Sequence, residues 1–153
     1  MYQPDGSRPA GTNNLTAPSN GNADAARIAF SSVRQGIHTG SGTIIDVNDY
    51  YDPTVGQTVY KSGRTTLVTF GTVIATKKSK YSAAFGTLYN QVEVDYNAGA
   101  GDSGGPVYYR EYLFGQWHTT YYGLHVGSTA GGYRYFTPYT GIRTELSAVP
   151  LVK

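Results

Sequence analysis

The chain has 153 residues, no cysteine and 14% charged residues, with a formal net charge of +2. This length suits a single domain with a hydrophobic core. The composition excludes disulfides and thiolate metal sites, and no apolar run approaches the length of a membrane-spanning helix. There is no basic run or aromatic–basic interleaving, so neither nucleic acid nor a membrane is an expected partner, and no metal or other cofactor is implied.

The 20 glycines, the 15 tyrosines and the β-branched residues stand in short runs, which is typical of a small all-β barrel. Residues 1–23 mix Pro, Gly, Asn, Ser and Thr, so we expect a loop or a disordered arm there. Residues 24–30 have the pattern of one strand. Residues 31–55 have that of a connection, with a short strand at 43–47.

From about residue 57 the turn signals become regular, and six strands are predicted, at 57–61, 67–76, 88–95, 105–111, 117–126 and 132–137. Six antiparallel strands make one barrel, which we assign to 56–153. Ile142, Leu146 and Val149 follow at i, i+4 and i+7, and this spacing predicts a short amphipathic helix at the C-terminal end.

The most informative motif is the run Gly101-Asp102-Ser103-Gly104-Gly105-Pro106. Its glycines permit a tight turn that projects a serine hydroxyl, while backbone N–H groups converge where a carbonyl oxygen becomes negative. The alternative is a Gly-rich hairpin turn without chemistry. A serine hydroxyl is a poor nucleophile at neutral pH, so a catalytic role requires a histidine base and a carboxylate that orients it.

This run resembles the nucleophile loop of chymotrypsin-like serine proteases. The resemblance implies that Ser103 is the nucleophile and that the amides of Gly101 and Ser103 form the oxyanion hole. It also implies that the Asp102 carboxylate anchors the loop from behind, by pairing with a buried positive group.

A second segment, 59–73, resembles the opening hairpin of the second barrel in bacterial proteases of the α-lytic and streptogrisin type. Those relatives commonly carry a disulfide across this hairpin, and its two cysteine positions correspond to Tyr60 and Phe70, so an aromatic pair is expected here instead. Leu67 stands where the family usually has glycine, which leaves the turn geometry after Thr66 open.

Residues 24–30 resemble the family segment that carries the triad aspartate, which makes Asp24 the candidate. In the family the catalytic histidine precedes this aspartate, yet residues 1–23 contain no histidine. The chain is also shorter than a two-barrel protease usually is. We therefore expect part of the first barrel to be missing and 24–55 to be its remnant. His38 could act as the base in place of the family's catalytic histidine; the alternative is a solvated loop histidine.

A remnant strand at 24–30 would have an unpaired edge. We expect a second copy of the chain or a companion fragment to cover that edge.

The run 123–127 is similar to the Gly-Ile-His run of glutamate-specific relatives, in which the histidine receives the substrate carboxylate. The resemblance implies a specificity pocket beside Ser103 formed by His125, Val126 and Gly127. The alternative for His125 is a hydrogen-bonded structural histidine.

Arg134 shares a strand face with Phe136, so if Phe136 lines the pocket wall, Arg134 points into the pocket and could bind a carboxylate as a fork. An outward-facing arginine is the alternative. Asn97 stands where trypsin-like enzymes place the aspartate that attracts Lys or Arg, which disfavours a basic P1 residue.

The sequence thus predicts an all-β fold: the second, six-stranded barrel of a chymotrypsin-like serine endopeptidase with a short C-terminal helix and a remnant of the first barrel. The expected substrates are proteins or peptides, with a preference for acidic P1, and the expected location is extracellular although no signal peptide is visible. The isolated chain is expected to be inert because the base is absent. The alternative is a catalytically dead protease-fold module with a binding or structural role, for which a Tyr-rich surface could serve.

Overall fold

The computed structural model describes residues 11–29, 33–40, 42–83, 85–128 and 131–153. Residues 1–10 of the predicted arm and Phe30 of the predicted strand lie outside this range. Within it the chain forms eleven strands and one helix: β1 (Thr12–Thr16), β2 (Ala26–Ala29), β3 (Gly36–His38), β4 (Ile44–Asp46), β5 (Asp49–Tyr50), β6 (Thr58–Gly63), β7 (Leu67–Ser82), β8 (Gly86–Val94), β9 (Pro106–Leu113), β10 (Gln116–Ser128), β11 (Arg134–Pro138) and α1 (Tyr139–Leu146).

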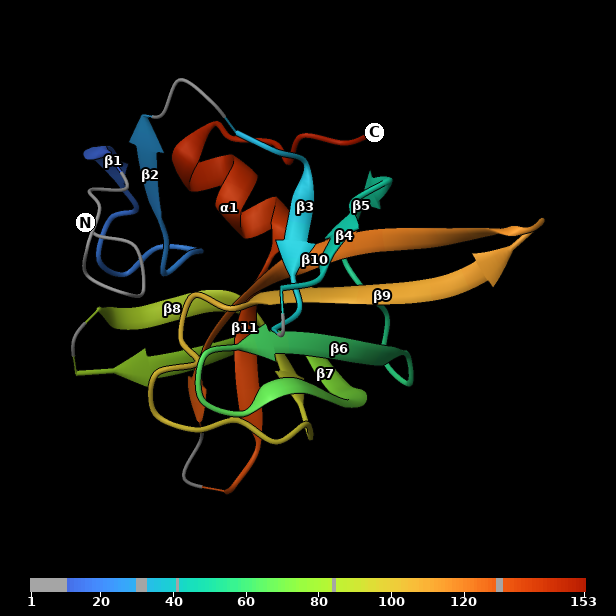
Figure 1. The fold of residues 1–153 in the computed structure, drawn as a ribbon. Coiled ribbons are helices and arrows are strands. Elements are labelled where there is room, and N and C mark those ends of the chain that lie inside the picture. Colours follow the sequence, from blue (N-terminus) through green and yellow to red (C-terminus); the bar gives the residue numbers. More distant parts are fainter. Residues whose placement is uncertain (1–10, 30–32, 41, 84, 129–130) are drawn as a thin grey trace.

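Six strands close into a barrel in the order β11-β8-β7-β6-β9-β10, because β10 pairs back onto β11 (Figure 1). Each of these six pairings is antiparallel. The short strand β5 adds to β10 in parallel. The predicted six-stranded barrel with a C-terminal helix is therefore confirmed.

The strands and the helix differ from the prediction in length. β7 continues to Ser82, beyond the predicted end at residue 76, because register shifts against β8 let the two strands stay paired as they twist. In α1, Ile142 and Leu146 face a buried cluster as expected. Val149 lies beyond the helix and is 59% exposed, since the helix ends where Ser147 adopts a left-handed conformation with φ +46°.

The barrel interior is filled mainly by valines from alternating strand positions. The central cluster contains Val59, Val73, Val92, Val94, Tyr96, Val107, Tyr122 and Phe136, all nearly inaccessible to solvent. Alternation along a strand sends every second side chain inward, which explains why β-branched residues recur at this spacing. This core fixes β6, β9 and β10, the strands that flank the motif at 101–106.

The part of the chain before the barrel forms two small hairpins. β1 pairs with β2, so the described part of the predicted loop arm contains a strand. β3 and β4 pair with each other, and Ile37 and Ile45 pack against Tyr108 of the barrel. Among the described residues β2 has no second neighbouring strand. Coverage of its free edge by another chain stays a prediction.

The described residues contain no helix that is long and apolar enough to cross a membrane. They also contain no group of three or more His, Cys, Asp or Glu side chains arranged to hold a metal ion.

Candidate active site

The loop that carries Ser103 is a tight turn with two left-handed glycines. Gly101 has φ +96° and Gly104 has φ +82°, conformations that favour glycine. The Gly104 N–H donates to the His125 carbonyl at 2.8 Å, which ties the loop to β10. Among the described residues nothing accepts a hydrogen bond from the N–H of Gly101 or Ser103. These two donors are therefore available to an incoming oxyanion.

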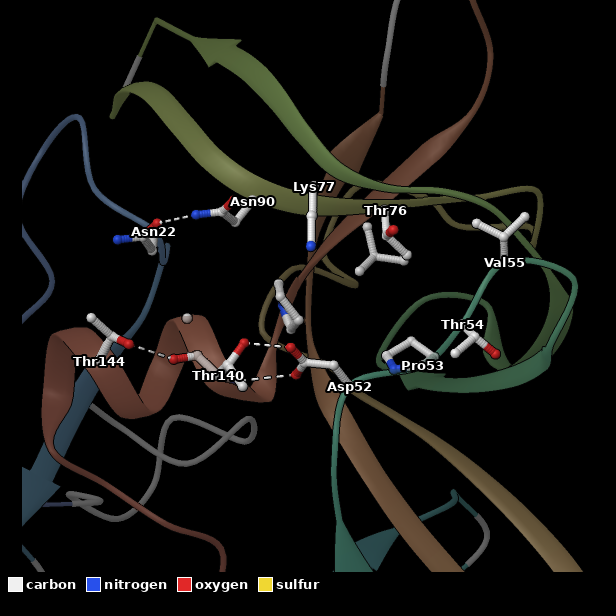
Figure 2. A pocket seen from close by; sticks show the side chains of 13 residues that line it. Asn22, Asp52, Pro53, Thr54, Val55, Thr76, Lys77, Asn90, Thr140 and Thr144 are labelled. Atoms are coloured by element: carbon white, nitrogen blue, oxygen red, sulfur yellow. Dashed lines mark hydrogen bonds between the residues drawn. The ribbon is translucent and has the colours of Figure 1, made fainter.

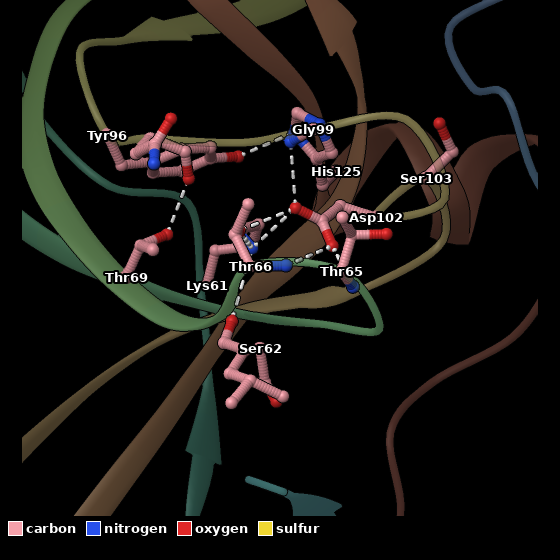
Figure 3. Close-up of polar contacts among 12 residues, drawn as sticks. Lys61, Ser62, Thr65, Thr66, Thr69, Tyr96, Gly99, Asp102, Ser103 and His125 are labelled. Carbon is pink, nitrogen blue, oxygen red and sulfur yellow. Dashed lines mark hydrogen bonds and ion pairs between the residues drawn. The ribbon is translucent and has the colours of Figure 1, made fainter.

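Asp102 anchors this loop from behind through a buried ion pair. Its carboxylate lies 3.0 Å from Lys61 Nζ, and both side chains are 0% exposed. It also accepts hydrogen bonds from the N–H groups of Thr65, Thr66 and Gly99 and from the Thr66 hydroxyl, at 2.6–3.1 Å. Figure 3 shows the carboxylate surrounded by these donors, with Ser103 on the outer side of the loop.

These contacts determine the ionisation of Asp102. Burial alone would raise the pKa of the carboxyl, but the hydrogen bonds from Thr66, Gly99 and Thr65 and the Lys61 ammonium lower the pKa well below its usual range. The carboxylate is therefore charged at neutral pH, and its buried negative charge is compensated inside the protein.

The resemblance predicted a buried positive group without naming it, and Lys61 is that group. The strand periodicity indicates that Lys61 points inward, since it lies two residues after the buried Val59 and shares the inward face of β6. Gly63 completes the arrangement. A Cβ on Gly63 would lie 2.3 Å from an Asp102 carboxylate oxygen, so a side chain there would displace the carboxylate.

A cleft of about 530 Å³ opens in front of the loop. It is lined by His38, Gly40, Ser62, Gly63, Arg64, Leu67 and residues 101–105. Inside it the Ser103 hydroxyl donates to the Val126 carbonyl at 2.9 Å, so no imidazole accepts its proton in this arrangement.

His38 shares the cleft with Ser103, and hydrogen bonds hold both its ring and its backbone carbonyl. The Gly40 N–H donates to His38 Nδ1 at 3.2 Å, and the Ser62 hydroxyl donates to the His38 carbonyl at 2.7 Å. Because Nδ1 accepts a hydrogen bond, the neutral ring carries its proton on Nε2 and has no free lone pair there.

Asp24 does not line this cleft. Its N–H donates to the Thr137 hydroxyl at 3.2 Å, and its half-buried carboxyl has a pKa raised by burial. The structure therefore places Gly101, Asp102 and Ser103 in this cleft, and Asp24 is not among the residues that line it.

His125 is 3% exposed, and its Nδ1 lies 2.9 Å from the Tyr96 hydroxyl in a hydrogen bond. Burial lowers the pKa of His125 to about 4, and the Lys61 charge acts in the same direction. The ring is therefore neutral at pH 7. Burial likewise raises the pKa of Tyr96 well above its usual value, so its phenol stays protonated.

The other residues of the predicted specificity pocket lie around this pair. Arg134 is close enough to affect the pKa of both His125 and Tyr96, and it donates to the Gly132 carbonyl. Phe136 is fully buried in the barrel core, Val126 packs against Leu88 and Tyr135, and a Cβ on Gly127 would lie 3.5 Å from the Tyr135 hydroxyl. Asn97 is exposed and accepts a hydrogen bond from Thr69 through its carbonyl.

Comparison with solved structures defines the class of protein. The chain has the fold of the bacterial chymotrypsin-like serine proteases, and many such structures match it. The chymotrypsin of Cellulomonas bogoriensis is 23% identical, with a TM-score of 0.70 over 86% of this chain and 71% of that one. Protease A of Thermobifida fusca is 25% identical, with a TM-score of 0.65 over 84% of this chain and 66% of that one.

A third similar structure is a glutamic acid-specific serine protease that utilizes a novel histidine triad in substrate binding. It is 28% identical, with a TM-score of 0.62 over 78% of this chain and 62% of that one. The chain thus spans about two thirds of the length of these three proteases. No protein-family model and no curated protein matches it.

Proposed function

We propose that this chain carries the nucleophile and oxyanion hole of a secreted serine endopeptidase, and that a base from another polypeptide segment completes the site. Ser103 would attack the scissile carbonyl of a protein or peptide substrate, the Gly101 and Ser103 amides would stabilise the oxyanion, and water would hydrolyse the acyl-enzyme. The observation that carries the proposal is the pair of unbonded N–H groups beside Ser103, held in place by the buried Asp102 carboxylate.

The missing element is the base. Ser103 donates to a backbone carbonyl, and His38, the histidine that lines the cleft, has the wrong proton arrangement to accept from it. Loss of a triad member commonly lowers kcat by factors of about 10⁴–10⁶. We therefore expect the isolated chain to be nearly inert. Asp24 would orient the histidine, as the family resemblance suggests, when the segment that carries this histidine adds its strand to the site.

A fluorophosphonate probe tests this proposal, with mass added at Ser103 as the readout. We expect slow labelling of the chain alone, faster labelling in proportion to added free imidazole, and no labelling of Ser103→Ala. His38→Gln should label like the parent chain. Rapid labelling without imidazole that disappears in His38→Gln would show that His38 is the base. Absence of labelling even with imidazole would favour the catalytically dead module.

We further propose a preference for acidic P1 residues. In the tautomer that an acidic P1 residue requires, Tyr96 donates to Nδ1 of the neutral His125 across their 2.9 Å hydrogen bond, and Nε2 carries a proton that can be donated to a substrate carboxylate. Arg134 adds a permanent positive charge nearby. The hydrogen-bond partner of His125 Nδ1 is a tyrosine phenol, and the described residues place no second histidine against this ring.

Peptidyl diphenyl phosphonates with Glu, Leu or Lys at P1 measure this preference through the same labelling of Ser103 in the presence of imidazole. We expect the glutamyl probe to react at least about tenfold faster than the leucyl probe, because the leucyl side chain leaves the donors unpaired. Arg134→Ala should remove most of the difference, whereas the control Arg110→Ala should retain it. An unchanged ratio in Arg134→Ala would refute the pocket assignment.

A further inference from the structure

A second cavity, of about 590 Å³, lies between the start of α1, the bulged part of β7 and β8 and the loop before β6 (Figure 2). It shares no lining residue with the Ser103 cleft. Its walls combine polar groups from Asp52, Lys77 and several threonines with apolar side chains such as Val55 and Val92. This mixture of convergent polar groups over an apolar floor is typical of a small-molecule site.

The backbone is unusual at this cavity. Lys77 has φ +55° and Asn90 has φ +57°; asparagine tolerates this left-handed region, whereas lysine seldom adopts it. The β7–β8 register shifts between Ala75 and Lys78 and again between Lys78 and Lys80. Both left-handed residues line the cavity. Backbone strain of this kind concentrates at binding and catalytic sites.

The cavity contains two opposite charges that are not paired with each other. Figure 2 shows the Lys77 ammonium extending into the cavity from β7, with Asp52 and Thr140 on the wall that it faces. Lys77 makes no hydrogen bond or ion pair with the described residues. Asp52 accepts hydrogen bonds from the N–H and the hydroxyl of Thr140, which fix its position at the start of α1.

A third wall is already ordered without a ligand. The Asn90 side-chain amide donates to the side-chain oxygen Oδ1 of Asn22 at 2.7 Å, and the Asn22 side-chain amide donates to the Glu145 carboxylate at 2.8 Å. These bonds hold the strand β8, the segment before β2 and the helix together around the cavity. Binding of a ligand would therefore cost little conformational entropy in this wall.

From this arrangement we propose that the cavity binds a free amino acid or a dipeptide as a zwitterion. The ligand carboxylate binds to the Lys77 ammonium, its ammonium binds to the Asp52 carboxylate, and its side chain lies on Val55 and Val92. A simple anion would be repelled by Asp52 and a simple cation by Lys77, so the charge pattern selects a ligand with both. This site is independent of the proposed chemistry at Ser103.

The test is titration of alanyl-leucine into the Ser103→Ala chain, followed by calorimetry and by amide chemical shifts. This background prevents hydrolysis and separates the result from the proposed protease activity. We expect shifts at residues of the second cavity, and at least about tenfold weaker binding when the dipeptide is N-acetylated or C-amidated. Lys77→Gln should weaken binding of the free dipeptide by a similar factor.

Two further variants make the result decisive. Lys78→Gln removes an adjacent exposed lysine that does not line the cavity, and we expect it to bind like the parent. Asp52→Asn keeps an oxygen for Thr140 but loses the charge, so it should bind weakly while its circular dichroism is unchanged. The proposal is overturned by no binding, by equal binding of the capped dipeptides, by equal losses in Lys77→Gln and Lys78→Gln, or by shifts confined to the Ser103 cleft.

Discussion

The Asp102 carboxylate depends on one cation. Lys61 and Asp102 are both inaccessible to solvent, so removing either partner leaves an uncompensated buried charge. We expect Lys61→Met to lower the free energy of unfolding by about 3–5 kcal/mol, which is a large fraction of the stability of an ordinary domain. Urea unfolding measures this change.

The double variant Lys61→Met with Asp102→Asn serves as the control for that measurement. Because it removes both charges, it should recover much of the loss. A single variant that unfolds at the same urea concentration as the parent would mean that the pair contributes nothing to stability.

His125 makes stability depend on pH in a different range. Burial lowers its pKa from the usual 6.5 to about 4, so between these values the unfolded chain binds a proton that the folded chain does not. Stability should therefore fall as pH decreases from 6.5 to 4, by up to about 1.4 kcal/mol per pH unit. Asp102, with its lowered pKa, loses its contribution only below about pH 4.

Urea unfolding at several pH values between 6.5 and 4.5 checks the assignment to His125. The slope of the unfolding free energy against pH should flatten in His125→Asn and persist in His118→Asn. Equal slopes in both variants would assign the effect to other groups.

At the scale of an element, the β6–β7 hairpin has two unfavourable local features, an exposed aromatic ring and a leucine in a left-handed conformation. Tyr60 and Phe70 face each other as predicted, with ring centroids 6.2 Å apart, yet Phe70 is 70% exposed and Tyr60 stacks more closely on Tyr108. The aromatic pair therefore buries less surface than a core pair would. Leu67, at the position where relatives usually have glycine, has φ +54°.

We expect Leu67→Gly to stabilise the hairpin. The left-handed conformation costs a residue with a Cβ about 1–2 kcal/mol, glycine costs about 0.5–1 kcal/mol in chain entropy, and the Leu67 side chain is 57% exposed. The net gain in unfolding free energy should be at most about 1.5 kcal/mol, measured by thermal or urea unfolding. Val68→Gly, in regular strand conformation next to it, should destabilise by a similar amount. A loss of stability in both variants would contradict the strain argument.

At the scale of the whole molecule, the barrel could be predicted because valines and tyrosines alternate between turn signals, and this pattern specifies strands before any contact is known. The tight turn at 101–106 could be predicted because its backbone requires glycine at Gly101 and Gly104. Lys61 was not identified as the partner of Asp102, since the two residues meet only when β6 and β9 pair across the sheet. β1 was missed because its Thr, Asn and Leu residues are exposed and gain their order from pairing with β2.

Lys61 occupies the middle of a strand rather than an end of the chain. Its charge reaches Asp102 when β6 pairs with β9, and the cation behind the Ser103 loop is therefore a side chain and not a chain terminus. Under the proposed function, the onset of activity would be set by the arrival of the imidazole, an association equilibrium that responds to concentration.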